Sequence, residues 1–369
     1  MAHALTIHAN GAVEMAYAGN KTPWHGLGNN LAHGATIEEW KAAAGMNWSI
    51  ESAIVEYSYN GGMMFASDRV VLHRSDNGAA LGVVSDGYKP VHPGQVLEFF
   101  RGLTDAAGFT LETAGTLFGG KRLWALASIG AEAAILDPRD KMKGYLLLST
   151  ACDGSMCTEA RYTTVRVVCN NTLGFARNGA KAAVKVTHRS TFDPAAVKRE
   201  LGIEAARSQF SDTMAEFRAL AETEVTPLQV ITATAELFHP GFDGFDRAEK
   251  MKLIDKATGP ITKVGELALN KRAMGSEYDG TQGTAYGWLN AVTEHVDHEA
   301  RAHRQDTRLN SAWFGRGDQV KERAHQMAVE MMTADGSTRT VYQAVAVQEP
   351  AAEPVVSLDD VLAATPAYA

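Results

Sequence analysis

The residues best suited to contact a ligand lie in one basic segment, Ala160–Phe192, which contains no aspartate or glutamate. The whole chain has a formal net charge of −8, so this segment sets positive charge apart within an acidic protein. Lysine and arginine neutralise phosphates, and rings between them can stack on bases. The segment predicts a single-stranded DNA interface made of Arg161, Tyr162, Arg166, Asn170, Asn171, Arg177, Lys181, Lys185 and Arg189.

The same charges permit a second interpretation, in which a basic edge pairs with acidic helices elsewhere in the fold. Asn170 and Asn171 follow a predicted strand, where side-chain amides cap a helix, hold a turn or reach the edge of a nucleotide. Cys169 has no identifiable base and is expected to be a buried, unreactive thiol. The segment therefore offers binding chemistry and no nucleophilic catalysis.

A second cluster, Lys21–Gly28, places Trp24 and His25 among a proline and two glycines that fix an irregular backbone. Trp24 either fills the edge of a core or, together with His25, contacts a ligand or a second subunit. The glycine spacing lacks the Lys-Ser/Thr that follows a phosphate-binding loop. The cluster therefore does not predict a nucleotide site.

A third cluster is the helical pattern at Thr284–Arg304, in which Trp288 belongs to an apolar stripe. His295, Asp297 and His298 stand close together on it, a spacing that fits a metal site or ion pairs with neighbouring helices. No zinc signature accompanies them. We expect Trp288 to be a core residue, and we expect no metal.

The elements that must position these clusters begin with strands. Asn60-Gly61-Gly62 and Asp76-Asn77-Gly78 are turn signals that separate three predicted strands, and Pro93 starts a helix that Gly108 ends. This β-β-β-α unit is followed by further strands, so we expect an α+β fold with an N-terminal mixed or antiparallel sheet and few covering helices. The later strands are predicted at Phe109–Thr113, Arg122–Ile129, Gly144–Thr150 and Arg161–Cys169.

The chain changes to helical patterns at Asp193-Pro194, a cap followed by a first helical residue, and Thr226-Pro227 repeats that signal. We expect a sheet domain at residues 1–192, a helical C-terminal half packed on it at 193–334, and an extended, partly disordered tail at 335–369. The tail contains prolines and a short apolar stripe at Leu358, Val361 and Leu362. It is either a docking segment for a protein partner or a solvated end.

Composition limits the class of protein. The 369 residues are 45% hydrophobic and 21% charged, as in globular domains, and no apolar run approaches the ~18 residues that cross a bilayer. The start lacks the features of a signal peptide, and three cysteines give no even disulfide set. We therefore expect a protein of the cytoplasm without membrane contact.

Three ordered motifs resemble the phage and plasmid protein family grouped as domain of unknown function 932. They are Pro23–Gly28, Arg166–Leu173 and Thr284–His298, and they span nearly everything but the tail. The resemblance implies a phage, prophage or plasmid product and supplies no catalytic residue. More distantly, the β-β-β-α order at Trp48–Ala107 is similar to the core of Red-beta and Rad-type single-strand annealing proteins, which hold one DNA strand in a basic groove.

These features predict a single-stranded-DNA-binding or strand-annealing protein of a phage or plasmid, acting in recombination or replication. We expect a homo-oligomer, a ring or filament, with no catalytic residue and no cofactor, because annealing requires only that strands be brought together and aligned. Two other classes stay open. One is a metal-dependent nuclease using His295, Asp297 and His298, and the other is a host-takeover or anti-defence protein whose acidic bulk mimics nucleic acid.

Overall fold

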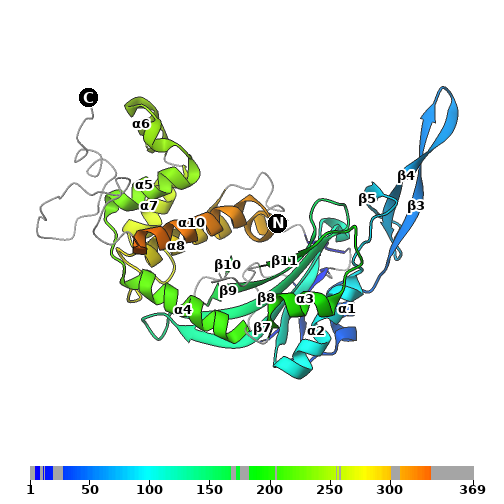
Figure 1. The fold of residues 1–369 in the computed structure, drawn as a ribbon, viewed down its shortest axis with the longest axis horizontal. Coiled ribbons are helices and arrows are strands. Elements are labelled where there is room, and N and C mark those ends of the chain that lie inside the picture. The colour runs from blue at the N-terminus through cyan, green and yellow to red at the C-terminus, as the bar shows by residue number, and fades with distance from the viewer. Residues whose placement is uncertain are drawn as a thin grey trace, which may run out of the picture.

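The structure of the chain is a computed structural model that describes residues 5–8, 11, 13–19, 28–167, 172–174, 183–203, 206–254, 256, 259–300 and 308–333. Figure 1 shows a large sheet in the middle of the molecule, helices below it and to one side, and a narrow strand pair that projects from the other end. The predicted tail docking segment lies outside the described residues. The α+β class with a helical C-terminal half is confirmed.

The large sheet has eight strands in the order β10-β9-β8-β7-β6-β1-β2, with β11 also paired to β9. Among the described residues, β1 and β2 pair in parallel and the other strand pairs of this sheet are antiparallel, so the predicted mixed or antiparallel sheet is confirmed. Its strands are β1 (Met15–Ala18), β2 (Asn29–Leu31), β6 (Thr110–Leu117), β7 (Arg122–Ala134), β8 (Lys141–Ala151), β9 (Thr158–Arg166), β10 (Thr172–Gly174) and β11 (Ala183–Val186).

The predicted β-β-β-α unit is present in the predicted order. It consists of β3 (Ile50–Tyr59), β4 (Gly62–Arg74), β5 (Ala80–Ser85) and α2 (Pro93–Ala107). Asn60 and Gly61 both have positive φ, which gives the tight turn that Asn-Gly favours between β3 and β4. The three strands form a separate sheet in the order β3-β4-β5, and they do not join the main sheet. The three strands are therefore separate from the main sheet, whereas α2 packs against it.

The helical half starts where the sequence predicts. Asp193 accepts hydrogen bonds from the first turn of α3, and Thr226 forms a capping box with Gln229 at the start of α5. A π-helical turn at His295–Glu299 continues α8. The helices are α1 (Ile37–Ala43), α3 (Pro194–Leu201), α4 (Ala206–Glu222), α5 (Pro227–Phe238), α6 (Arg247–Ile254), α7 (Pro260–Leu269), α8 (Ala285–Glu294), α9 (Arg308–Phe314) and α10 (Arg316–Thr333).

The two faces of the main sheet are covered differently. One face packs against α2 and α4 and contributes Ala127, Leu146 and Leu148 to the main core. The opposite face carries a smaller apolar cluster around Trp124 that is covered by Trp313 and Phe314 of α9. The helical half thus packs on the sheet, as expected, while the division near residue 192 stays a prediction.

Candidate nucleic-acid interface

Strand β9 carries Arg161, Tyr162 and Arg166 of the predicted DNA-binding segment. It has β8 on one side, and β10 and β11 on the other. Side chains of a strand alternate between the faces of its sheet. Arg161 and Thr163 therefore lie on the face covered by α9, whereas Tyr162 and Arg166 lie on the face of the main core.

Arg166 is an interior residue with an exposed fraction of 1%. Its Nε and Nη2 donate to the two carboxylate oxygens of Asp140 over 2.7 and 2.8 Å, and Nη1 donates to the carbonyl oxygen of Met274 over 3.0 Å. The guanidinium also lies over the ring of Tyr286. The buried bidentate pair holds β9 to the turn before β8, and the contacts with Met274 and Tyr286 hold it to the start of α8, so Arg166 is not presented to a ligand in solution.

Tyr162 is likewise enclosed, with an exposed fraction of 0%. Burial raises the pKa of its phenol, which stays protonated throughout the neutral range. The ring packs in the main core and cannot stack on a base in this arrangement. The physical reason is the alternation of β9, which turns residue 162 toward the helices.

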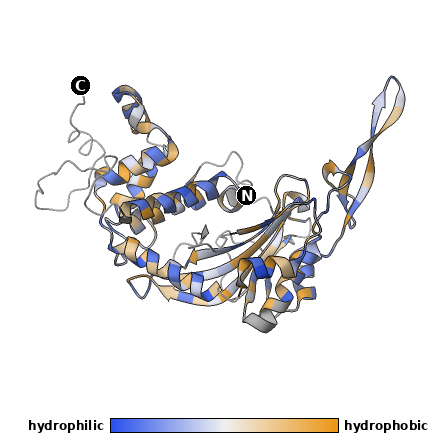
Figure 2. Ribbon diagram, in the orientation of Figure 1, coloured by the Kyte–Doolittle hydropathy of each residue, from blue (hydrophilic) through white to orange (hydrophobic). Residues whose placement is uncertain are grey.

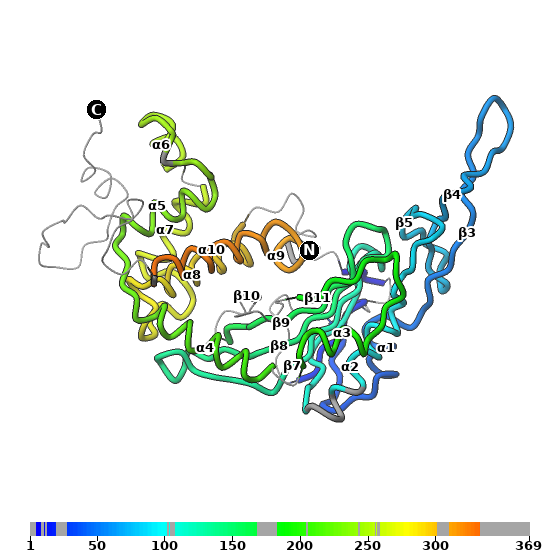
Figure 3. The backbone as a smooth tube through the Cα atoms, in the orientation of Figure 1, coloured from blue at the N-terminus to red at the C-terminus, as the bar shows by residue number. Residues whose placement is uncertain are grey.

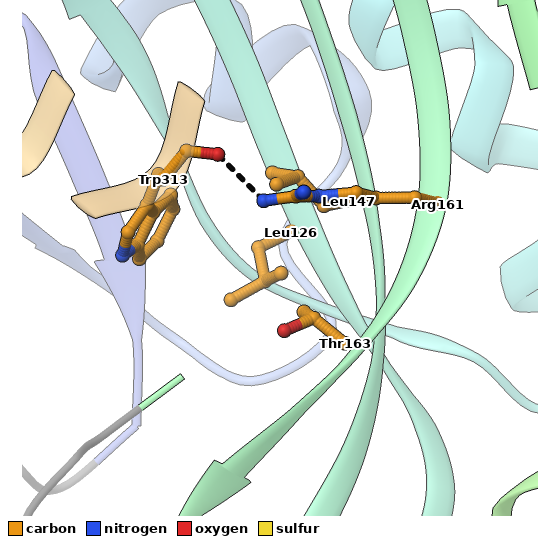
Figure 4. A pocket seen from close by; sticks show the side chains of 5 residues that line it. All are labelled: Leu126, Leu147, Arg161, Thr163 and Trp313. Atoms are coloured by element: carbon orange, nitrogen blue, oxygen red, sulfur yellow. Dashed lines mark hydrogen bonds between the residues drawn. The ribbon is translucent and has the colours of Figure 1, made fainter. Parts of the chain in front are cut away.

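Arg161 ties β9 to the two helices α9 and α10. It is 15% exposed, its Nη2 donates to Asp318 Oδ1 over 3.0 Å, and it also donates to the carbonyl oxygen of Trp313. The carboxylate of Asp318 thus pairs with the guanidinium that was predicted to contact a phosphate. Figure 4 shows this arginine at a small pocket between the sheet and α9, lined by Leu126, Leu147, Arg161, Thr163 and Trp313.

The exposed cations of the segment lie on and after β11. Lys185 is 63% exposed, pairs across the sheet with Glu159, and has its Nζ 3.4 Å from that carboxylate. Arg189 is exposed in the turn that follows β11. Among the described residues of the predicted interface, these two are the exposed ones.

A third exposed cation, Lys89, was not predicted and lies beside His188, the residue before Arg189. Its backbone N–H donates to the carbonyl oxygen of His188 over 2.7 Å, and Nδ1 of His188 is 3.0 Å from the carbonyl oxygen of Lys89. Lys89 precedes α2 and is far from the segment in sequence, so only the fold brings it there. We call Lys89, Lys185 and Arg189 the basic edge.

The remaining predicted interface residues lie outside the described residues. They are Asn170, Asn171, Arg177 and Lys181, together with Trp24 and His25 of the second cluster. Arg177 and Lys181 belong to the stretch of chain that joins β10 to β11, which begins at Ala183.

The third cluster is structural where it can be seen. Trp288 is 1% exposed and its indole N–H donates to Thr234 Oγ1 over 2.9 Å, which confirms the predicted core role. Asp297 is buried and pairs with Lys321 of α10 over 2.7 Å. Nδ1 of His295 is 3.5 Å from the carboxylate of Glu299. The polar face of this helix thus orders it against its neighbours.

Glu294 adds a buried acid beside this cluster. Its Oε2 accepts the backbone N–H of Met274 over 2.9 Å, and burial raises the pKa of its carboxyl group. Within the described part of the chain, no three His, Cys, Asp or Glu side chains are grouped so that they could hold a metal ion. Free thiols there are Cys152, which is buried, and Cys157, which is partly buried.

The fold and the site define an α+β protein with a mixed sheet, a helical half and a short basic edge. The chain belongs to the family described as "Domain of unknown function (DUF932)", whose pattern matches residues 80–313, which confirms the predicted family. The motifs Arg166–Leu173 and Thr284–His298 lie within the match, and Pro23–Gly28 lies outside it. The match covers the basic edge and starts after β4. No curated protein and no solved structure matches the chain. In the described residues no helix has the length and apolar character needed to span a membrane.

Proposed function

We propose that this protein binds single-stranded DNA along the basic edge. The observation that carries the proposal is that three exposed cations lie on or near β11: Lys185 on the strand, Arg189 in the turn after it, and Lys89 in the loop that is hydrogen-bonded to His188 of that turn. The joining stretch before β11 adds Arg177 and Lys181 to the same part of the chain without adding an acid. Cations gathered at one edge can follow one phosphate backbone, and phosphate neutralisation drives binding through the release of counterions.

The local acid sets the strength of this binding. Glu159 is the carboxylate nearest to Lys185, and it must give up part of that contact when a phosphate arrives. A few cations with one competing acid favour moderate, sequence-independent affinity that falls with salt. Such affinity suits a protein that holds strands while they align, and we extend the proposal to strand annealing in the replication or recombination of a phage or plasmid.

The proposal is tested by fluorescence anisotropy with labelled single-stranded oligonucleotides of several sequences at low salt. The double variant Lys185→Ala/Arg189→Ala should raise the Kd roughly tenfold for every sequence, because it removes phosphate contacts and no base contact. Its matched control is Arg247→Ala/Lys252→Ala, which removes two exposed cations from α6. The control should leave the Kd unchanged.

Two results would refute the proposed function. The first is the absence of binding by the wild-type chain at low salt. The second is an equal loss of affinity in both double variants, because that would indicate an effect of net charge instead of a defined interface.

A further inference from the structure

The strand pair β3–β4 carries most of the exposed apolar surface of the described chain. Figure 3 shows it as a narrow loop extending beyond the rest of the molecule, and Figure 2 shows hydrophobic stretches on it. We call residues Ile50–Arg74 the arm. The large hydrophobic side chains that are about half exposed or more along it are Ile54, Tyr57, Tyr59, Met63, Met64 and Phe65.

The register places these side chains on both faces of the arm. Tyr57 is opposite Met64, and Glu56 is opposite Phe65, so the two pairs lie on opposite faces. An ordinary surface hairpin keeps one face polar. A contiguous apolar patch that no described part of its own chain covers indicates a contact with another molecule.

The base of the arm is fixed to the main sheet. Arg74 is 3% exposed, its Nη1 lies 2.9 Å from Glu14 Oε1, and its guanidinium stacks over the ring of Trp48. Thr116 of β6 donates to Glu14 as well, over 2.6 Å. The arm is therefore presented in a defined direction by a buried polar anchor.

The charges of the arm exclude a nucleic-acid partner. From Ala53 to Ser67 the only charged side chain is Glu56, and Glu51 and Asp68 flank that stretch. An acidic, apolar hairpin is repelled by phosphate backbones and by anionic lipid headgroups alike. The chemistry fits a protein surface that is itself apolar.

In a second copy of this chain, the described residues form one large exposed apolar surface. Away from the three-stranded sheet, the strongly exposed large hydrophobics of the described residues are Ile7, Leu136 and Met274. The apolar complement that one copy can present to another is therefore the arm itself. A contact between the same surface on two copies is twofold symmetric and closes on itself.

The outer edge of β3 allows this contact, because β3 is an edge strand of its sheet with β4 as its neighbour. An exposed edge strand is a template for pairing with another chain. We propose that two copies associate through their arms, with β3 pairing antiparallel to the partner's β3 about a twofold axis at Ile54. The pairing joins the two three-stranded sheets into one.

The charges are compatible with this register and disfavour one centred on Glu56. With Ile54 opposite its own copy, Glu51 stands opposite Tyr57 and Glu56 stands opposite Ser52, so each carboxylate faces a neutral side chain. A register centred on Glu56 would put two carboxylates together at the axis. Ile54, which is 64% exposed, would then be away from the centre instead of buried at it.

Sedimentation velocity across a range of concentrations tests the association. The wild-type chain should be a dimer or contain a dimeric unit, and Ile54→Lys, which places two ammonium groups at the axis, should raise the dimer Kd by at least about 100-fold. The matched control is Val83→Lys on β5, a valine that is 54% exposed and lies off the β3 edge. It should change the Kd less than about threefold.

Disulfide trapping tests the register. Opposed residues of antiparallel strands have Cα atoms about 4.5–5.5 Å apart, which a disulfide spans. Ile54→Cys should therefore give a covalent dimer with oxidised glutathione, while Val83→Cys and the wild-type chain should not.

Three results would overturn the inference. They are a wild-type chain that stays monomeric at high concentration, a dimer that a folded Ile54→Lys variant leaves intact, and a dimer sensitive to Ile54→Lys that Ile54→Cys does not trap. The inference does not depend on the proposed function. A dimer that binds no DNA would refute only that function, and a monomer that binds DNA would refute only the arm contact.

Discussion

Two pairs of cations from one acid-free segment have opposite fates in this fold. Arg161 and Arg166 lie on β9, which has strands on both sides and covered faces, and both are engaged by carboxylates of the same chain. Lys185 and Arg189 lie on and after the short strand β11 and are exposed. The place of a strand in its sheet thus decides whether a cation pairs with a carboxylate inside the fold or is left exposed to solvent.

The largest expected effect is on stability, at the buried pair of Arg166 and Asp140. Asp140→Ala leaves the guanidinium of Arg166 buried without its carboxylate, and should lower the free energy of unfolding by about 3–5 kcal/mol. Urea unfolding followed by circular dichroism measures it. Arg189→Ala is the control at the edge and should stay within about 0.5 kcal/mol of wild type. Similar losses in the two variants would remove the distinction between the regions.

A smaller effect is expected at the partly buried pair of Arg161 and Asp318. Asp318→Ala should cost about 1–3 kcal/mol, because it removes a charge-assisted bond between β9 and α10. A double-mutant cycle with Arg161→Ala separates the pair from other effects of each substitution. A coupling energy close to zero would show that the pair does not hold α10 to the sheet.

The buried carboxyl group of Glu294 makes the stability of the fold depend on pH. Because burial raises the pKa of Glu294, the native state holds this proton to a higher pH than the unfolded chain does. The contribution of Glu294 to stability is therefore present at low pH and is lost as pH rises through the raised pKa. Glu294→Gln should flatten this decline while its amide oxygen still accepts the N–H of Met274. An unchanged profile would assign the decline to other groups.

The sequence predicted much of the local structure and less of the assembly. Asn60-Gly61 predicted the β3–β4 turn, Asp193 and Thr226 predicted helix starts, and the helical spacing predicted the burial of Trp288. These features depend on neighbours in sequence. Such signals extend over a few residues, which is why they can be recognised in one chain.

Long-range contacts are what the sequence could not supply. Asp140 contacts Arg166 across the β8–β9 pair, and Lys89 contacts His188, 99 residues away, only through the fold. The basic segment gave no sign of which cations would find internal carboxylates, because those acids lie outside it. Nor did the strand pattern show that β3, β4 and β5 would leave the main sheet, since local alternation does not specify which strands become neighbours.

The most direct test of the central claim is the salt dependence of oligonucleotide binding by wild type and by Lys185→Ala/Arg189→Ala. The slope of log Kd against log salt should fall by about one to two in the double variant. Each phosphate contact that is removed lowers the number of counterions released on binding. Arg161→Ala should leave the slope unchanged, because its guanidinium is held by Asp318. An unchanged slope in the double variant would contradict the assignment of binding to the basic edge. So would a decrease in slope that is seen only in Arg161→Ala.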